Sequence, residues 1–310
     1  MRSKKMLGNL VLFITAMIWG TAFAFQRVGM ESIEPISFTA VRMLLAAVAV
    51  GALALALQKK AHSDPSSSYS RMSTEEKRQY NRQTVLGGVC CGFFLALASG
   101  AQQIGLLYTT AGKAGFITAL YIILVPIFAF LLFRKRSGLL VWLAALIGVF
   151  GMYLLCATEG LRLARGDALM VLCAALFSFH ILSCDHFARR GNPLMISAIQ
   201  FLTCFVLSAV FAFLLEDPTW DKIRSAAIPI LYCGLVSGGI GYTLQLIGQK
   251  HTDPAVASLI MSLESVFAVL GGAVILQEHM TTRELLGCVV LFAAIILAQL
   301  PAPKRLRQNP

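Results

Sequence analysis

The sequence predicts an all-α integral membrane protein with ten transmembrane helices, arranged as two inverted five-helix repeats. Three observations carry this prediction: the composition, the number of long apolar runs, and two fixed offsets at which the chain matches itself. Of the 310 residues, 57% are hydrophobic and 13% are charged, whereas a soluble domain has about 45–50% apolar and roughly 25% charged residues. The mean hydropathy of +0.75 points the same way. The composition is therefore that of a chain whose solvent is the bilayer.

Ten apolar runs supply the predicted spans. A transmembrane helix needs about 20 apolar residues to cross a hydrocarbon core of about 30 Å, and continuously apolar runs indicate helices rather than a barrel. The runs cover residues 7–28, 36–57, 85–108, 111–133, 139–156, 167–187, 193–215, 227–249, 254–277 and 281–300. The long polar stretch at 58–84 is predicted to be a cytoplasmic loop, with a short surface helix at 74–82.

The basic residues divide unevenly between the two sides of the predicted membrane. If the N-terminus is cytoplasmic, 18 of the 26 Lys and Arg residues fall on the cytoplasmic side, 7 fall on the other, and Arg42 lies within a span. Cytoplasmic loops carry such an excess, so we expect a multi-pass protein of a bacterial cytoplasmic (inner) membrane with both termini inside. Because the charge follows the membrane sides, the net charge of +11 argues for contact with the lipid bilayer and against a nucleic-acid partner.

Two offsets indicate an internal duplication. At an offset of 143 residues, Gln102 matches Gln245 and Leu120 matches Leu263; at an offset of 158, Gly8 matches Gly166. One insertion in the 58–84 loop reconciles the two offsets. The predicted repeats are residues 7–156 and 166–300. Five spans in each repeat force the second copy to enter from the opposite side, and inverted repeats are typical of secondary transporters with a site near the midplane.

Several local motifs resemble the drug/metabolite transporter superfamily, specifically its EamA-type members. The motifs are Trp19-Gly20-Thr21, Arg42, the stretch 105–126, and 262–268 (Ser-Leu-Glu-Ser-Val-Phe-Ala). The chain departs from the family pattern at three places: Ser265 stands where Pro is usual, and Gln277-Glu278 and Arg134-Lys135-Arg136 stand where the repeats have Gly-Glu. The resemblance covers residues 8–300. It implies a ten-helix transporter of amino acids, other metabolites or toxic solutes.

The predicted function is that of a secondary transporter, an exporter of a small metabolite, amino-acid-like or drug-like solute, working by alternating access with a proton as the candidate coupling ion. The alternatives are a non-transporting membrane scaffold or sensor and a membrane-embedded enzyme. The sequence lacks the P-loop, HExxH and Gly-x-Ser-x-Gly patterns, which argues against enzyme chemistry. No cofactor or metal is expected, since the eight cysteines lie in or beside spans without metal-ligand spacing. The oligomeric state is not indicated.

Glu264 is the most informative candidate site residue. It lies near the middle of the ninth span, where a charge costs about 2.5–3.5 kcal/mol on insertion scales, so it is expected to face the bundle interior or an aqueous cavity. One interpretation is a substrate or proton site. The other is a structural hydrogen bond to a neighbouring helix.

Arg42, Gln245, Tyr242 and Gln102 form a second group of candidates. Arg42 either attracts an anionic group or bonds carbonyls and snorkels outward, and we favour the structural role. Gln245 and Tyr242 share a glycine-rich face of the eighth span, and Gln102 holds the matching place in the third. Such faces either line a polar cavity or form a tight helix–helix seam.

Trp19, His180 and Tyr121 complete the candidates. Trp19 either stacks on a substrate or packs within the bundle. His180 shares a stripe with Cys173 and Cys184, but the spacing along one helix and the lack of an acidic partner favour a packed or hydrogen-bonded histidine over a metal ligand or proton contact. Tyr121 is a weaker candidate for the cavity wall.

Overall fold

The computed structural model describes residues 2–64, 66–108, 111–135, 137–156, 165–275 and 281–300, so most of the predicted linker at 157–165 lies outside the described residues. Every regular element in these ranges is a helix, which confirms the all-helical prediction. Six of the helices are long and apolar enough to cross a membrane by length and composition. They are α1 (Arg2–Gly29), α2 (Pro35–Ser63), α3 (Thr74–Leu106), α7 (Arg165–Ala188), α8 (Pro193–Leu215), and the continuous helical stretch Ala227–Gln249.

The stretch Ala227–Gln249 contains three segments. It begins as α10 (Ala227–Leu231), continues as the π-helix η1 (Tyr232–Tyr242) and ends as α11 (Thr243–Gln249). A π-helix has i→i+5 hydrogen bonds and is frequently found at functional sites. The short helix α9 (Trp220–Ser225) precedes the stretch.

The fourth and ninth predicted spans are each divided by a two-residue break. The fourth consists of α4 (Ala111–Thr118) and α5 (Tyr121–Phe133), and the ninth of α12 (Pro254–Met261) and α13 (Glu264–Ile275). At both breaks an amide bonds the carbonyl three residues back, Leu120 to Ile117 and Leu263 to Ile260, which is the tighter turn of a 3₁₀-helix. The two breaks are 143 residues apart. Helices α6 (Leu139–Cys156) and α14 (Thr282–Gln299) complete the described elements.

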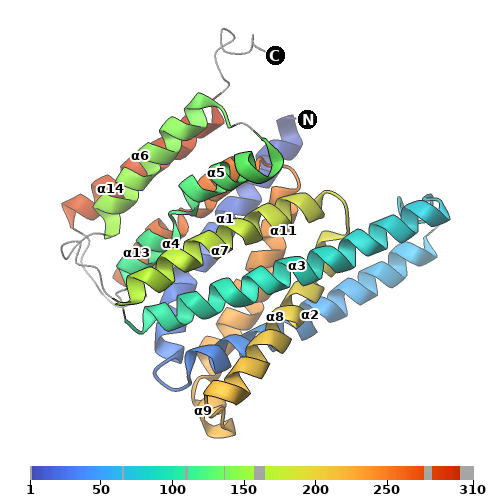
Figure 1. Cartoon of the computed structure of the whole chain (residues 1–310), viewed down its shortest axis with the longest axis horizontal. Helices are drawn as coiled ribbons and strands as arrows, with labels where there is room; N and C mark the ends of the chain where they lie inside the picture. Colours follow the sequence, from blue (N-terminus) through green and yellow to red (C-terminus); the bar gives the residue numbers. More distant parts are fainter. Residues whose placement is uncertain are drawn as a thin grey trace.

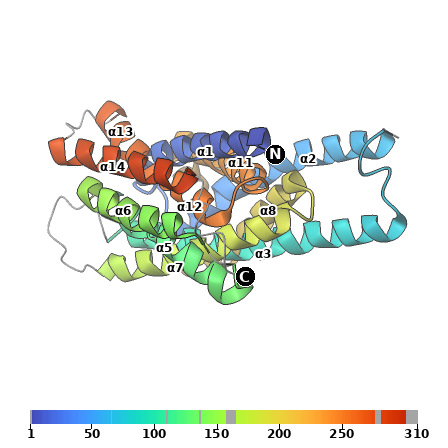
Figure 2. The same cartoon turned by 90° about the horizontal axis from the view of Figure 1, so that it is seen from above.

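The predicted loop at 58–84 is shorter than expected. Helix α2 continues to Ser63 and α3 begins at Thr74, so only residues 64–73 connect them. A capping box explains the early start of α3, because the Ser73 side chain accepts from the Glu76 amide while Glu76 accepts from the Ser73 amide. Figures 1 and 2 show the two helices extending together beyond the rest of the bundle.

Several of the long helices pack in pairs from different halves of the chain. Helix α2 packs along α8, and α6 packs along α14, as Figures 1 and 2 show for the second pair. Helix α3 packs against α7 and α8, while α1 packs against η1 and α11, and η1 also contacts α2. The main hydrophobic core lies among these helices and includes Leu12, Met43 and Ile122.

The two ends of the bundle are closed by different polar contacts. At one end, the Glu34 face, Lys222 forms an ion pair with Glu34, and the Glu216 carboxylate accepts from the amides of Ile36 and Ser37. At the other end, the Asp185 face, Asp185 binds Lys135 and Arg189 (N–O distances 3.0 and 2.7 Å), and Arg189 also donates to the carbonyls of Gln249 and Thr252.

Helix α1 crosses α13 at very short range through Gly20. A Cβ added at Gly20 would lie 2.4 Å from the Phe267 Cβ and 2.6 Å from the Glu264 carbonyl oxygen. Only a glycine permits this approach, and it brings α1 against the segment that carries Glu264.

Replacing Gly20 with Ala is therefore expected to destabilise the protein by about 1–3 kcal/mol, the usual cost of overpacking. Gly51→Ala is the matched control, because nothing lies within 4 Å of a Cβ at that position, and removing a helical Gly gains up to about 1 kcal/mol. Unfolding of the purified variants in detergent measures both. Equal stability of the Gly20→Ala variant and the wild type would contradict the close crossing.

The Glu34–Lys222 pair predicts a pH-dependent contribution at the Glu34 face. Although partial burial raises it, the pKa of Glu34 lies below its usual value because Lys222 donates a hydrogen bond to the carboxylate. A lowered pKa contributes stability above the unfolded-state value of about 4.3 and loses it as the pH falls through the folded-state value. Lys222→Gln should lower the melting temperature at neutral pH and match the wild type in acid. A pH-independent difference would contradict the assignment.

Candidate functional site

A polar and aromatic cavity lies in the middle of the bundle. Its lining residues come from both halves of the chain: Trp19, Phe23, Gln26, Arg42, Gln102, Thr118, Tyr121, Phe177, Ile181, Ser237, Tyr242, Gln245 and Glu264. The empty space is about 480 Å³ including its opening, but only about 30 Å³ admits the centre of a water molecule. That narrow part has room for about two water molecules, so a solute larger than water needs the helices to move apart.

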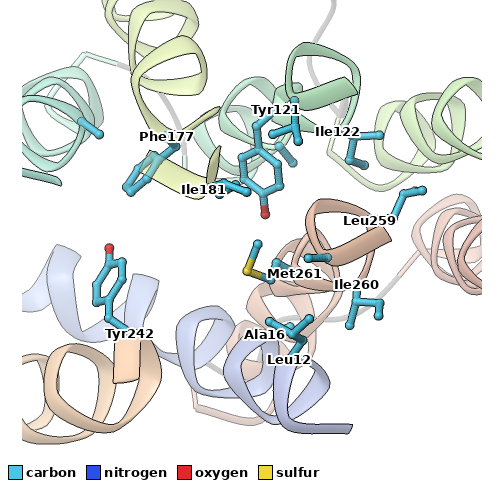
Figure 3. Close-up of a cluster of buried hydrophobic side chains, with 14 of the residues drawn as sticks. Leu12, Ala16, Tyr121, Ile122, Phe177, Ile181, Tyr242, Leu259, Ile260 and Met261 are labelled. Carbon is cyan, nitrogen blue, oxygen red and sulfur yellow. The ribbon is translucent and has the colours of Figure 1, made fainter. Parts of the chain in front are cut away.

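Tyr121 and Glu264 meet at the centre of this cavity. The Tyr121 hydroxyl donates to the Glu264 carboxylate at 2.9 Å, and the side chains are buried. Each residue is the first after a helix break, and they are 143 positions apart, so they are counterparts under the self-match. Figure 3 shows the hydroxyls of Tyr121 and Tyr242 pointing into the space between the helices, with Met261 near Tyr121. Glu264 thus lines the cavity and bonds a neighbouring helix.

Aromatic side chains form one wall of the cavity. Trp19 packs against Tyr242 with ring centroids 4.7 Å apart, and its indole Nε1 donates to the Ser237 carbonyl at 3.2 Å. A Cβ on Gly241 would lie 2.7 Å from that Nε1, so the glycine allows the indole to approach η1. Trp19 therefore both packs within the bundle and lines the cavity.

Three lining residues have buried polar atoms without a hydrogen-bond partner. They are Gln26 through Oε1, Arg42 through Nε, and Gln245 through both amide atoms. Unpaired buried polar atoms cost free energy, about 1–3 kcal/mol each in typical cases, unless a ligand or water satisfies them. Their convergence on one cavity suits a polar ligand.

The cavity extends toward the Glu34 face. Gln26 lies in the last turn of α1, which ends on that side, whereas its counterpart Cys184 is not part of the cavity lining. Arg42 lies two turns after the start of α2, which begins there. The Asp185 face is held by the contacts of Asp185 and Arg189 described above.

Four pairs of lining residues are counterparts under the two offsets. They are Trp19 with Phe177 and Phe23 with Ile181 at 158, and Gln102 with Gln245 and Tyr121 with Glu264 at 143. The sequence reasoning missed Phe23, Gln26, Thr118, Phe177, Ile181 and Ser237 as lining residues. Phe177 and Ile181 could have been found from the sequence, because they lie 158 residues after Trp19 and Phe23.

His180 has the packed and hydrogen-bonded environment that the sequence analysis favoured, whereas Arg42 departs from its favoured interpretation. His180 is outside the cavity lining, with its Nε2 3.2 Å from the Gln200 amide oxygen and its ring packed on Tyr242. The predicted snorkelling of Arg42 is wrong, because the residue is 2% exposed and lies against the cavity. Its position two turns inside α2, beneath the packed α8, keeps the guanidinium from the surface.

The Tyr121–Glu264 hydrogen bond predicts a stability effect. Tyr121→Phe leaves a buried carboxyl oxygen without its donor, which costs about 1–3 kcal/mol. Tyr108→Phe removes a hydroxyl from a residue that is 58% exposed and serves as the matched control. Thermal unfolding in detergent should separate the two variants. If both variants have the melting temperature of the wild type, the hydrogen bond does not contribute to stability as its geometry indicates.

Comparison with known proteins identifies the family. Residues 6–157 and 164–300 each match the model of the EamA-like transporter family. An uncharacterised transporter of Archaeoglobus fulgidus is 27% identical over 96% of this chain and 87% of its own length. The uncharacterised transporter YoaV of Bacillus subtilis is 23% identical (95% and 96%), and protein PagO of Salmonella typhimurium is 22% identical (97% of each).

A solved crystal structure shares the fold. It superimposes with a TM-score of 0.75, covers 97% of this chain and 98% of its own, and is 20% identical in sequence. The family and two of these three relatives have the names of transporters rather than enzymes. The chain belongs to the EamA-like transporter family.

Proposed function

We propose that the protein is a secondary transporter that moves a small polar solute through the central cavity by alternating access. The observation that carries the proposal is the cavity itself, where two broken helices bring Tyr121 and Glu264 together among unpartnered polar atoms. Broken helices at the midplane are typical of transporter binding sites, because irregular backbone within a membrane is tolerated where it lines a cavity.

The packing of the helices supports two inverted repeats. If each helix is replaced by its counterpart in the other repeat, the contact between α3 and α7 becomes the contact of η1 and α11 with α1. The contact between α3 and α8 becomes the contact between η1 and α2. In the pairs α2–α8 and α6–α14 the two helices are each other's counterparts, so the replacement leaves these contacts unchanged. This is the pattern that a two-fold axis through the cavity produces. The two separate matches to the family model agree with it.

Rocking of the two halves around this axis supplies the alternating access. In the present conformation the cavity extends toward the Glu34 face, and the Asp185 face is tied by Asp185, Lys135 and Arg189. Under the exchange of repeats, the alternative state opens the cavity toward the Asp185 face. The narrow space at the centre fits a conformation close to occluded.

We propose that the transport is export coupled to protons. The excess of Lys and Arg assigns the Asp185 face to the cytoplasm, so the Glu34 face is external. Glu264 is the titratable acid of the cavity lining, and its hydrogen bond to Tyr121 places a proton-binding carboxyl between the two repeats. Entry of a proton from the Glu34 face and its release at the Asp185 face would drive a solute outward.

Untargeted metabolite profiling of the culture medium tests this function. Cells with the wild-type protein should enrich at least one solute outside relative to an empty vector. Glu264→Gln should abolish or strongly reduce that enrichment, because the amide still accepts from the Tyr121 hydroxyl but cannot bind and release the coupling proton. The measurement is made at matched membrane abundance of the two proteins.

Glu75→Gln is the control variant, because it makes the same change at an exposed position in the first turn of α3. It should export like the wild type. Equal export by the Glu264→Gln variant would contradict the role of Glu264, and identical profiles of wild type and vector would count against export.

A further inference from the structure

We propose that Arg42 is the anion anchor of the cavity and that the transported solute carries a carboxylate. This inference rests on the proposed transport function and names its substrate class. Arg42 lines the cavity, is 2% exposed, and has its Nε buried without a partner. A bare guanidinium inside a membrane is costly, so such residues pair with an acid or with carbonyls.

The protein supplies no such partner in the described ranges. Asp185 pairs with Lys135 and Arg189, Glu34 pairs with Lys222, and none of the described hydrogen bonds is donated by the Arg42 guanidinium. Glu264, the acid in the same cavity, accepts a hydrogen bond from the Tyr121 hydroxyl and none from Arg42 in the described residues.

Glu216, the acid that follows the packed α8, is also engaged. Its two carboxylate oxygens accept from the amides of Ile36 and Ser37 and from the Ser37 hydroxyl, which together cap the start of α2. The positive charge of Arg42 thus remains available to a ligand.

The surroundings of Arg42 favour a planar oxyanion. The guanidinium carbon lies 5.7 Å from the centroid of the Phe38 ring, a cation–π contact that attracts the charge but accepts none of its N–H hydrogen bonds. The five donors of a guanidinium lie in its own plane, and their fork matches a carboxylate in a two-point hydrogen bond. The aromatic side chains of Trp19, Phe23 and Tyr242 line the same cavity and suit an apolar part of the solute.

The second repeat shows that the fold does not require this charge. The counterpart of Arg42 at the 158-residue offset is Gln200, a neutral residue that is fully buried and whose amide oxygen lies 3.2 Å from His180 Nε2. The equivalent place in the bundle therefore accommodates a glutamine. Arg42→Gln is accordingly the natural substitution for a test.

A fluorescence titration tests the anchor directly. Trp19 is left as the single tryptophan by Trp142→Phe and Trp220→Phe, and the purified full-length protein is placed in lipid nanodiscs. 4-Iodobenzoate and its neutral amide, 4-iodobenzamide, serve as heavy-atom quenchers of matched size. The carboxylate should quench Trp19 saturably and bind more tightly than the amide.

Arg42→Gln should weaken carboxylate binding by roughly tenfold or more, as expected for a lost hydrogen bond to a charged group, and should leave the amide unchanged. Arg42→Lys should keep part of the preference for the carboxylate, and this second variant decides the question if Arg42→Gln does not fold. Arg27→Gln is the control, because Arg27 is exposed and lies outside the cavity lining; it should bind like the wild type.

Two results would overturn the proposal: a wild-type protein that does not prefer the carboxylate, or an Arg42→Gln variant that keeps the full preference. Metabolite profiling separates this failure from that of the transport function. An exported solute without an acidic group, or equal export by wild type and Arg42→Gln, would refute the anion anchor and leave transport in place. Arg42-dependent binding without any exported solute would refute the transport function and leave the anion anchor in place.

Discussion

A bilayer offers no water to a buried polar group, so such a group must find its partner inside the protein, and the Tyr121–Glu264 hydrogen bond meets this demand at the centre of the bundle. Both residues begin a helix segment directly after a break. The close crossing of α1 and α13 at Gly20 brings α1, which also carries Trp19, against the Glu264 segment. The cavity, its aromatic wall and its unpartnered amides are arranged around this one contact.

The sequence predicted the helical membrane fold because composition and run length alone decide that a chain must bury its backbone in helices. It also predicted that Glu264 faces the interior, because a charged group in the middle of the membrane is too costly to face the lipid. Tyr121 and Glu264 are counterparts at the 143-residue offset, and the two-fold axis that we propose for the repeats would bring such counterparts together. The environment of Arg42 was not predictable, because the burial of a long side chain depends on which helix covers it. The π-helix of Tyr232–Tyr242 carried no recognisable signal beyond its glycines.

The two faces of the bundle differ in a way that the repeats make visible. Asp185 and Arg189 have Arg27 and Glu31 as their counterparts at the 158-residue offset, with the charges reversed. Arg189 donates to the carbonyls of Gln249 and Thr252, whereas a carboxylate at the equivalent place has no hydrogen to donate. The closure of the Asp185 face therefore has no copy of the same chemistry on the Glu34 face. The cavity lining is asymmetric in the same sense, since Gln26 and Arg42 belong to it and their counterparts Cys184 and Gln200 do not.

If the two repeats exchange roles, one face of the bundle closes as the other opens. Spin labels at Val28 and Tyr108 report on the Glu34 face, and labels at their counterparts His186 and His251 report on the Asp185 face. Double electron–electron resonance then compares the wild type with Asp185→Asn, which removes the charge that holds Lys135 and Arg189. An exchange of roles predicts that the 186–251 distance lengthens while the 28–108 distance shortens. Distances that lengthen together, or a 28–108 distance that stays fixed while the other changes, would contradict it.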